Sequence, residues 1–160
     1  MLTASELLNL VKDSEDIVKR VKKCGSSIEL PFKAVYRAEP RELIIDVDET
    51  RRDITYEPVQ ERAGWYVLYP GIYIIVLPRV EFPEDVEGML LPRSSFLRGS
   101  GWMLQGTKID AGFRGELVMQ LIGFRGVLHL RSGARVAHML AWRIGERFNY
   151  ALTGQYVDRI

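Results

Sequence analysis

Two short segments carry most of the residue types that could do chemistry. The first, LPRSSFLRGSGW (residues 91–102), places arginine and hydroxyl side chains among glycines, namely Arg93, Ser94, Ser95 and Arg98. Guanidinium and hydroxyl groups beside glycines can donate hydrogen bonds to phosphate oxygens while the backbone approaches them closely. No Walker pattern accompanies the segment, so a solvated polar turn explains it equally well when it is taken alone.

The second segment, GTKIDAGFRGE (residues 106–116), places a lone carboxylate at the end of an expected strand. Asp110 follows Ile109, and Ala111 and Gly112 form a tight turn that sets Phe113 just beyond it. A carboxylate in this position could deprotonate a water molecule, and the aromatic ring could stack on a sugar or a base. The alternative is a β-turn in which Asp110 bonds its own backbone and Phe113 enters the core.

The composition is that of an ordinary globular protein. The chain has 160 residues, of which 47% are hydrophobic and 27% charged, and this predicts a single domain over residues 1–160. With a formal net charge of +1 there is no bulk basic field for nucleic acid, so any anion must be bound by local groups. No run reaches about 18 apolar residues, which predicts a protein without a membrane span and a cytoplasmic location.

Cysteine and histidine are scarce in this chain. Cys24 is the only cysteine, which excludes an internal disulfide and suits a reducing compartment. His129 and His138 are the only histidines, so the ligands of a four-coordinate zinc centre are lacking.

The N-terminal residues 1–24 are expected to be helical. Thr3 and Glu6 have the spacing of a capping box, which predicts a first helix with apolar residues on one face. Asp13 or Ser14 is expected to cap a second helix over SEDIVKRVKK (residues 14–23), and Gly25 to end it.

From residue 27 onward the pattern changes to short strands separated by Gly, Pro and Asp. The predicted strands cover residues 27–37, 42–47, 64–69, 71–82, 88–92, 116–124, 126–130 and 134–144. Short strands with no helix-length pattern between them favour an all-β sandwich or barrel over residues 27–150, with a tail at 151–160. The polar residues 47–64 are expected to form an excursion or hairpin on the surface.

Taken in order, four motifs resemble the superfamily of deoxyuridine triphosphatases and deoxycytidine triphosphate deaminases. They are SIEL (residues 27–30), RSSFLRGSG (93–101), IDAGFRGE (109–116) and SGARVAHML (132–140). The resemblance covers most of the chain and is weakest over residues 47–64. It implies a mainly β protein with a distorted jelly-roll-like β-barrel, a homotrimer with active sites between subunits, and a deoxynucleoside triphosphate bound with Mg²⁺.

The resemblance also implies roles for particular residues. The triphosphate would be held by Arg93, Ser94, Ser95, Arg98 and His138. The nucleoside would be bound by Thr107, Ile109, Phe113 and Gln120, with Phe113 against the deoxyribose. Glu29 would reach the metal through water, while phosphates and waters hold Mg²⁺ itself. A core histidine at 138 and a solvated strand carboxylate at 29 explain those two residues equally well.

The two branches of the superfamily differ at one position. The deaminases use a glutamate to carry a proton to the cytosine ring, and aligning IDAGFRGELVMQL puts Gln120 there. A neutral amide cannot carry a proton, so the resemblance favours hydrolysis of dUTP to dUMP and pyrophosphate, with Asp110 as the base. Two alternatives stay open: a dCTP deaminase, alone or bifunctional, with Glu116 replacing the missing acid, and a non-catalytic nucleotide-binding module.

Some features depart from the typical deoxyuridine triphosphatase. Gly112 replaces an acidic residue, and His138 stands where the family mostly has glutamine. The segment NYALTGQYVDRI (residues 149–160) is more like the C-terminal lid of the deaminases, with Tyr150 and Gln155 as candidate lid contacts. This mixture resembles an archaeal-type deoxyuridine triphosphatase built on a deaminase-like frame.

Overall fold

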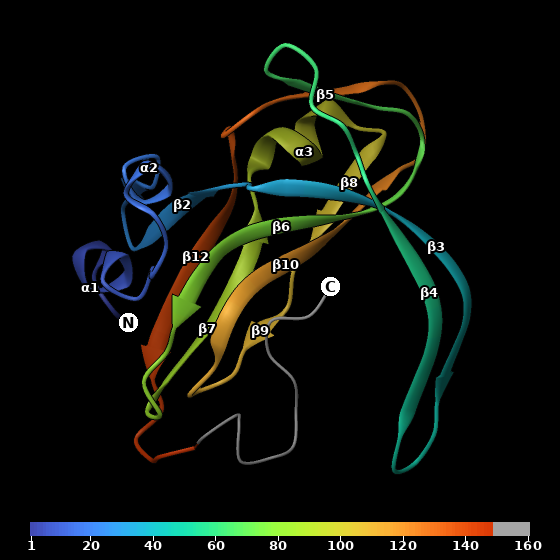
Figure 1. The fold of residues 1–160 in the computed structure, drawn as a ribbon. Helices are drawn as coiled ribbons and strands as arrows, with labels where there is room; N and C mark the ends of the chain where they lie inside the picture. Colours follow the sequence, from blue (N-terminus) through green and yellow to red (C-terminus); the bar gives the residue numbers. More distant parts are fainter. Residues whose placement is uncertain (149–160) are drawn as a thin grey trace.

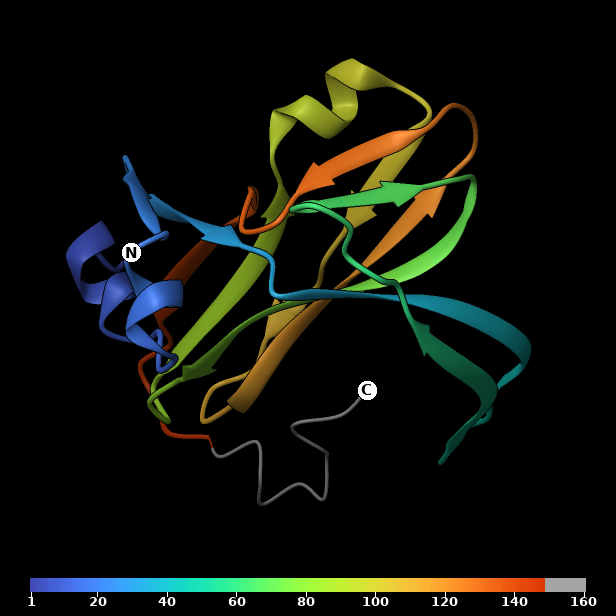
Figure 2. The same cartoon turned by 45° about the horizontal axis from the view of Figure 1, so that its top comes forward.

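Antiparallel strands make up most of the molecule. The computed structural model describes residues 1–148, whose arrangement is drawn in Figures 1 and 2. This described part of the chain contains three short helices, α1 (Ala4–Leu8), α2 (Glu15–Val18) and α3 (Ser94–Gly99). The strands are β1 (Lys22–Cys24), β2 (Ser27–Pro31), β3 (Ala34–Ile45), β4 (Thr50–Pro58), β5 (Trp65–Leu68), β6 (Gly71–Glu81), β7 (Val86–Pro92), β8 (Trp102–Gln105), β9 (Lys108–Ile109), β10 (Arg114–Gly123), β11 (Leu128–Arg131) and β12 (Arg135–Arg143).

Within residues 1–148 the strands group into two five-stranded sheets and one two-stranded sheet. Their orders are β1-β2-β12-β7-β9, β4-β3-β6-β10-β8 and β11-β5, and every pairing is antiparallel. Buried residues of both large sheets form one cluster, with Ile28 and Met139 from the first and Ile75 and Leu121 from the second. The prediction of a mainly β, jelly-roll-like fold is confirmed.

The beginning of the chain follows its capping signals but is less helical than expected. Thr3 and Glu6 form the predicted capping box of α1, and the Ser14 hydroxyl caps α2. Helix α2 ends at Val18, so the prediction of a helix to residue 23 and a helical segment to residue 24 is wrong. Gly25 has a φ of 61° and lies in the tight turn that joins β1 to β2, where a left-handed backbone suits a hairpin.

Two further segments differ from a simple strand pattern. The polar segment after residue 91 contains α3, which the strand-only pattern did not predict. Within residues 47–64, β4 pairs with β3 in the expected surface hairpin, which projects from the body of the molecule in Figure 1. Charged pairs such as Arg41 with Asp53, at 2.8 Å, cross between these strands, so their sequence lacks an alternating apolar pattern.

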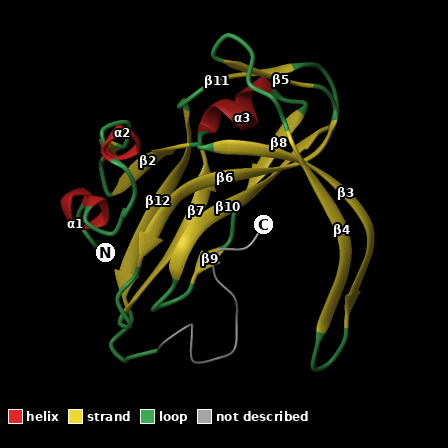
Figure 3. Ribbon diagram, viewed as in Figure 1, coloured by secondary structure: helices red, strands yellow, loops and turns green. Residues whose placement is uncertain are grey.

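The helices lie at the margins of the sheets, as Figure 3 shows. Within residues 1–148 none of them has the length and the apolar character that a bilayer-crossing helix requires.

Asp13 fastens the helical segment to the second large sheet. Its Oδ2 accepts hydrogen bonds from Lys33 Nζ and from the backbone nitrogen of Arg79, both at 2.9 Å, and its Oδ1 accepts one from the backbone nitrogen of Ser14 at 2.8 Å. Burial by itself would raise the pKa of Asp13, but these three hydrogen bonds outweigh it and hold the pKa below the ordinary aspartate value. The ionised carboxylate therefore contributes stability above the ordinary aspartate range, and this contribution is lost as the pH falls through the lowered pKa.

We expect Asp13→Asn to lower the free energy of unfolding by about 1–3 kcal/mol near neutral pH, because the amide keeps the shape but not the charge-assisted bonds. Urea unfolding of both proteins at a series of pH values measures the effect. The difference should shrink as the pH falls below about 4, where the unfolded chain begins to bind the proton, and should be lost once the pH is below the lowered pKa of the folded protein. A difference that stays constant over this range would contradict the assignment.

Candidate anion-binding and catalytic site

Three neighbouring strands bring distant candidate residues together. His138 in the middle strand β12 is directly opposite Glu29 in β2 and Leu91 in β7, and directly paired residues point to the same face of a sheet. Arg93 follows the end of β7, and its Nε lies 3.8 Å from Glu29 Oε1. His138 Nε2 lies 4.0 Å from the same oxygen. The structure thus unites Glu29, Arg93 and His138, three residues that the sequence placed in one site.

A fourth member of this cluster, Arg135, was not predicted. Its Nε lies 3.4 Å from Glu29 Oε2, and its Nη1 donates to the backbone oxygen of Arg20 at 3.1 Å. Strict alternation along β12 would put Arg135 and His138 on opposite faces. A β-bulge between Arg135 and Ala137 adds one residue to the strand and so turns the arginine onto the face of the histidine.

The cluster has the chemistry of an oxyanion site. The Glu29 side chain is 13% exposed, and two guanidinium groups and an imidazole surround it. Two permanent positive charges face one carboxylate, so the cluster carries an excess of directed donors. Arg135 Nε is buried and makes no hydrogen bond within residues 1–148, so it faces Glu29 Oε2 at 3.4 Å only as an ion pair.

A cavity of about 490 Å³ adjoins the cluster beneath α3. Arg93, Ser95 and Arg135 line it together with apolar side chains, among them Phe96 and Trp102. Two other predicted phosphate ligands, Ser94 and Arg98, are exposed on α3 and lie outside this lining.

The second candidate segment forms the expected tight turn. The backbone oxygen of Asp110 accepts a hydrogen bond from the nitrogen of Phe113 at 3.1 Å, and Gly112 has a φ of 79°. This left-handed backbone explains the glycine in place of an acidic residue. Phe113 packs against the core and Ile109 is buried, as in the simple turn interpretation. Thr107 uses its backbone oxygen to accept from the nitrogen of Leu90 at 3.2 Å.

Lys108 lies beside the candidate base. Its Nζ is 3.2 Å from Asp110 Oδ1 and 2.8 Å from Glu87 Oε2. Hydrogen bonds to Glu87 and then to Asp110 raise the pKa of Lys108 above its ordinary value, so it stays protonated beside both carboxylates. Residues 108 and 110 are two apart in an extended segment, a spacing from which this neighbour could have been predicted.

The side chain of Gln120 forms a hydrogen bond with another amide and not with an acid. It lies on β10 directly opposite Gln105 of β8, whose Nε2 donates to Gln120 Oε1 at 3.0 Å. The candidate lid residues Tyr150 and Gln155 lie outside the described residues.

Within one chain the two halves of the candidate site are far apart. Ile109 pairs with Gly88 near the start of β7, whereas Arg93 follows the end of that strand. The intervening length of extended chain separates Asp110 from Arg93 by about 20 Å. A single subunit therefore does not place the candidate base beside the oxyanion cluster.

Neither half provides a magnesium cage. A Mg²⁺ ion requires about six oxygen ligands, whereas Glu29 offers one carboxylate between two arginines and Asp110 shares Lys108 with Glu87. Glu29 does not fit as a direct ligand, and its contact through water stays a prediction.

The chain belongs to the dCTP deaminase-like family, whose model matches residues 1–144. A dCTP deaminase from Desulfurococcus amylolyticus is 30% identical over 115 residues, which are 71% of this chain and 63% of that protein. A probable deoxyuridine 5'-triphosphate nucleotidohydrolase from Methanopyrus kandleri is 32% identical over 115 residues, which are 71% of this chain and 70% of that protein. The superfamily predicted from the motifs is confirmed, and the names of the relatives divide between its two reactions.

A solved structure shows the same fold. The 2'-deoxycytidine 5'-triphosphate deaminase from Agrobacterium tumefaciens matches 90% of this chain and 48% of its own with a TM-score of 0.62, at 19% sequence identity.

The affinity for metal-free pyrophosphate measures how strongly the Glu29 carboxylate competes for the two arginines. We expect Glu29→Gln to tighten its binding about tenfold, because the carboxylate that competes for both arginines is removed. Arg93→Gln should weaken binding, and Glu57→Gln on the exposed strand β4 serves as the control for a charge change. Isothermal titration calorimetry checks all three, and a loss of affinity in Glu29→Gln would contradict the competition.

Proposed function

We propose that this protein hydrolyses dUTP to dUMP and pyrophosphate. The observation that carries the proposal is the hydrogen bond between Gln105 and Gln120, because the motif alignment predicts the deaminase glutamate at position 120 and this chain has a neutral amide there beside a second amide. The carboxylate of Asp110 is retained. Relatives named as probable deoxyuridine 5'-triphosphate nucleotidohydrolases support this choice.

The proposed reaction uses Asp110 as a general base. Its side chain is 37% exposed, so a water molecule can reach it. The water oxygen forms a bond to the α-phosphorus, its proton passes to the Asp110 carboxylate, and the bond from the α-phosphorus to the bridging oxygen of the β-phosphate breaks. Pyrophosphate leaves with the bonding electrons, and the guanidinium groups of Arg93 and Arg135 stabilise its charge.

Two features of the site would bind the nucleotide. Phe113 lies beside the turn of Asp110 and would pack against the deoxyribose. Arg93 and Ser95 border the cavity under α3 and would hold the phosphates. Magnesium would enter on the phosphates, since neither half of the candidate site within residues 1–148 supplies a cage of oxygen ligands.

The separation of Asp110 from Arg93 supports a site shared between subunits. We therefore propose the homotrimer that the family resemblance implies, with the base from one chain and the oxyanion cluster from another. Ring-like symmetry lets the two ends of β7 meet across an interface.

Deamination of dCTP is the second candidate, because the Desulfurococcus relative is named a dCTP deaminase. Glu116, the nearest substitute for the missing acid, is already engaged by Lys33, whose Nζ lies 2.6 Å from its Oε2. Lys33 also holds Asp13 at 2.9 Å, so this carboxylate belongs to a structural ion-pair network. This arrangement favours hydrolysis over deamination.

A substrate panel of dUTP, dCTP, UTP and dTTP tests the proposal. We expect pyrophosphate release from dUTP alone and no uridine nucleotide from dCTP. Asp110→Asn should lower the rate by about 100- to 10,000-fold, because the amide cannot take the proton. Deamination of dCTP, or tight binding of dUTP without turnover, would contradict the proposed reaction.

Mixed oligomers test the shared site. Asp110→Asn and Arg93→Gln should each be nearly inactive alone, whereas random reassembly of the two restores up to about a quarter of the sites, because only some interfaces combine both intact residues. Mass spectrometry confirms that the subunits have mixed, and Asp110→Asn mixed with itself is the control. An absence of recovery in proven mixed oligomers would show that each site is built within one chain.

A further inference from the structure

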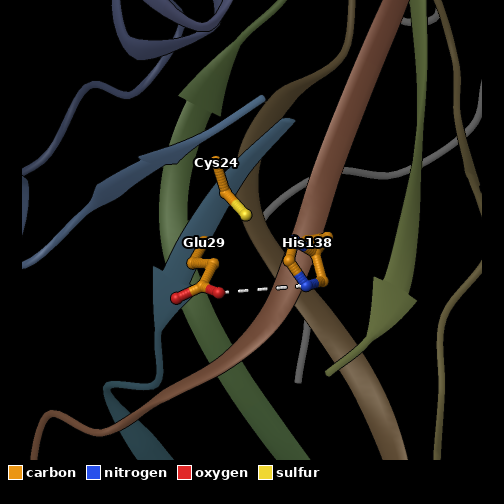
Figure 4. Close-up of side chains that lie close together, drawn as sticks. All are labelled: Cys24, Glu29 and His138. Atoms are coloured by element: carbon orange, nitrogen blue, oxygen red, sulfur yellow. Dashed lines mark ion pairs between the residues drawn. The ribbon is translucent and has the colours of Figure 1, made fainter. Parts of the chain in front are cut away.

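One sulfur, one nitrogen and one oxygen atom that could bind a metal ion lie close together, and two of their three residues belong to the oxyanion cluster. Cys24 at the end of β1, Glu29 in β2 and His138 in β12 each place one ligand atom within 4.8 Å of the other two. Figure 4 shows the three side chains directed toward a common space between their strands. Hairpin pairing puts Cys24 opposite Ser27, and sheet pairing puts Glu29 opposite His138, so the backbone register fixes this arrangement.

The hydrogen bonds of Ser27 determine which nitrogen of His138 is available. Its hydroxyl donates its only proton to the backbone oxygen of Cys24 at 2.9 Å. Its oxygen lies 3.1 Å from His138 Nδ1, and with that proton used it can only accept there. His138 therefore carries a proton on Nδ1, and in the neutral ring Nε2 presents a lone pair toward Glu29.

The contact between His138 Nε2 and Glu29 Oε1 is not a hydrogen bond. Nε2 and Oε1 are 4.0 Å apart, which is too long for a hydrogen bond even when the imidazole is protonated. The carboxylate of Glu29 accepts no hydrogen bond from any side chain in residues 1–148, since its contacts with the arginines are ion pairs at 3.4 and 3.8 Å. In a tetrahedral site with each atom about 2.0–2.1 Å from the ion, the two atoms would lie roughly 3.3 Å apart, so metal binding would draw His138 Nε2 and Glu29 Oε1 closer together.

We propose that Cys24, Glu29 and His138 bind one borderline-soft divalent transition-metal ion of the zinc class. Thiolate, imidazole and carboxylate are ligands that zinc accepts, whereas magnesium and calcium prefer oxygen alone. Three protein ligands leave a fourth position open for water or an oxyanion. The thiolate and the carboxylate together balance the two charges of the ion, so the neighbouring arginines do not face added positive charge.

Two neighbouring residues hold the side chains of the proposed ligands in place. Ser27 fixes the tautomer and the ring orientation of His138, and Arg135 pairs with the second oxygen of Glu29. Ser27 is thus a positioning residue that does not touch the metal. The proposal uses no nucleotide and stands or falls independently of the hydrolase activity.

Cobalt titration of the nucleotide-free protein tests the site. Cys24 is the only cysteine, so thiolate-to-cobalt charge transfer in the near ultraviolet can arise from no other residue of the chain. We expect one Co²⁺ per chain, displaced by Zn²⁺. Cys24→Ser should abolish the near-ultraviolet band, and Glu29→Gln and His138→Gln should each weaken binding at least about tenfold. His129→Gln, which changes the exposed histidine of β11, should bind like the wild type.

Ser27→Ala separates positioning from ligation. It should weaken cobalt binding by about 10- to 100-fold while the charge-transfer band returns at saturation, because all three ligands remain. Thermal melting without metal shows that each variant is folded. Half a cobalt per chain, or a wild-type band that survives unchanged in His138→Gln, would mean that the exposed thiol merely captures the ion and would overturn the proposal. A wild type without the band would overturn it equally.

Discussion

The register of three antiparallel strands determines what this protein can bind. Because His138 pairs with Glu29 on one side and with Leu91 on the other, residues from the two ends of the sequence share one face of a sheet. Arg93 extends that face beyond β7, and the bulge in β12 adds Arg135 to it. A slip of one residue in β12 would turn His138 into the core and separate the arginines from the carboxylate that balances them.

Strand β7 also sets the distance between the candidate base Asp110 and the oxyanion cluster. Its first half pairs with the short strand that precedes Asp110, and its end leads into α3 and the oxyanion cluster. Strand β7 is held in the sheet because β12 pairs with it along its length and because its own Leu90 is buried in the core. A fold that holds base and cluster apart so firmly cannot unite them by local flexing. This separation is the physical reason for proposing that different subunits supply the two halves.

Sequence reasoning succeeded where the signal was local. The capping residues Thr3 and Ser14 and most strands were predicted, because caps and apolar alternation depend on neighbouring residues alone. It failed where strand pairing decides the outcome, whether the partner strand is adjacent or distant in the sequence. Residues 22–24 became a strand because β2 offers them an edge to pair with, and Arg135 joined the cluster through a bulge that no periodicity reveals. The family motifs predicted Glu29 and His138 as site residues, but the position of Cys24 beside them became evident only from the register of the β1–β2 hairpin.

Glu29 connects the oxyanion cluster to the proposed metal site, and its two oxygens explain how. Oε2 faces Arg135, while Oε1 lies between Arg93 and the lone pair of His138. A phosphate that binds Arg93 and Arg135 would break their ion pairs with the Glu29 carboxylate. The carboxylate, no longer neutralised by the arginines, would then bind a cation more strongly. A metal ion on Oε1 would in turn leave the arginines freer to bind an anion. Anion and cation should therefore favour each other's binding here, and by thermodynamic linkage the coupling must be equal in both directions.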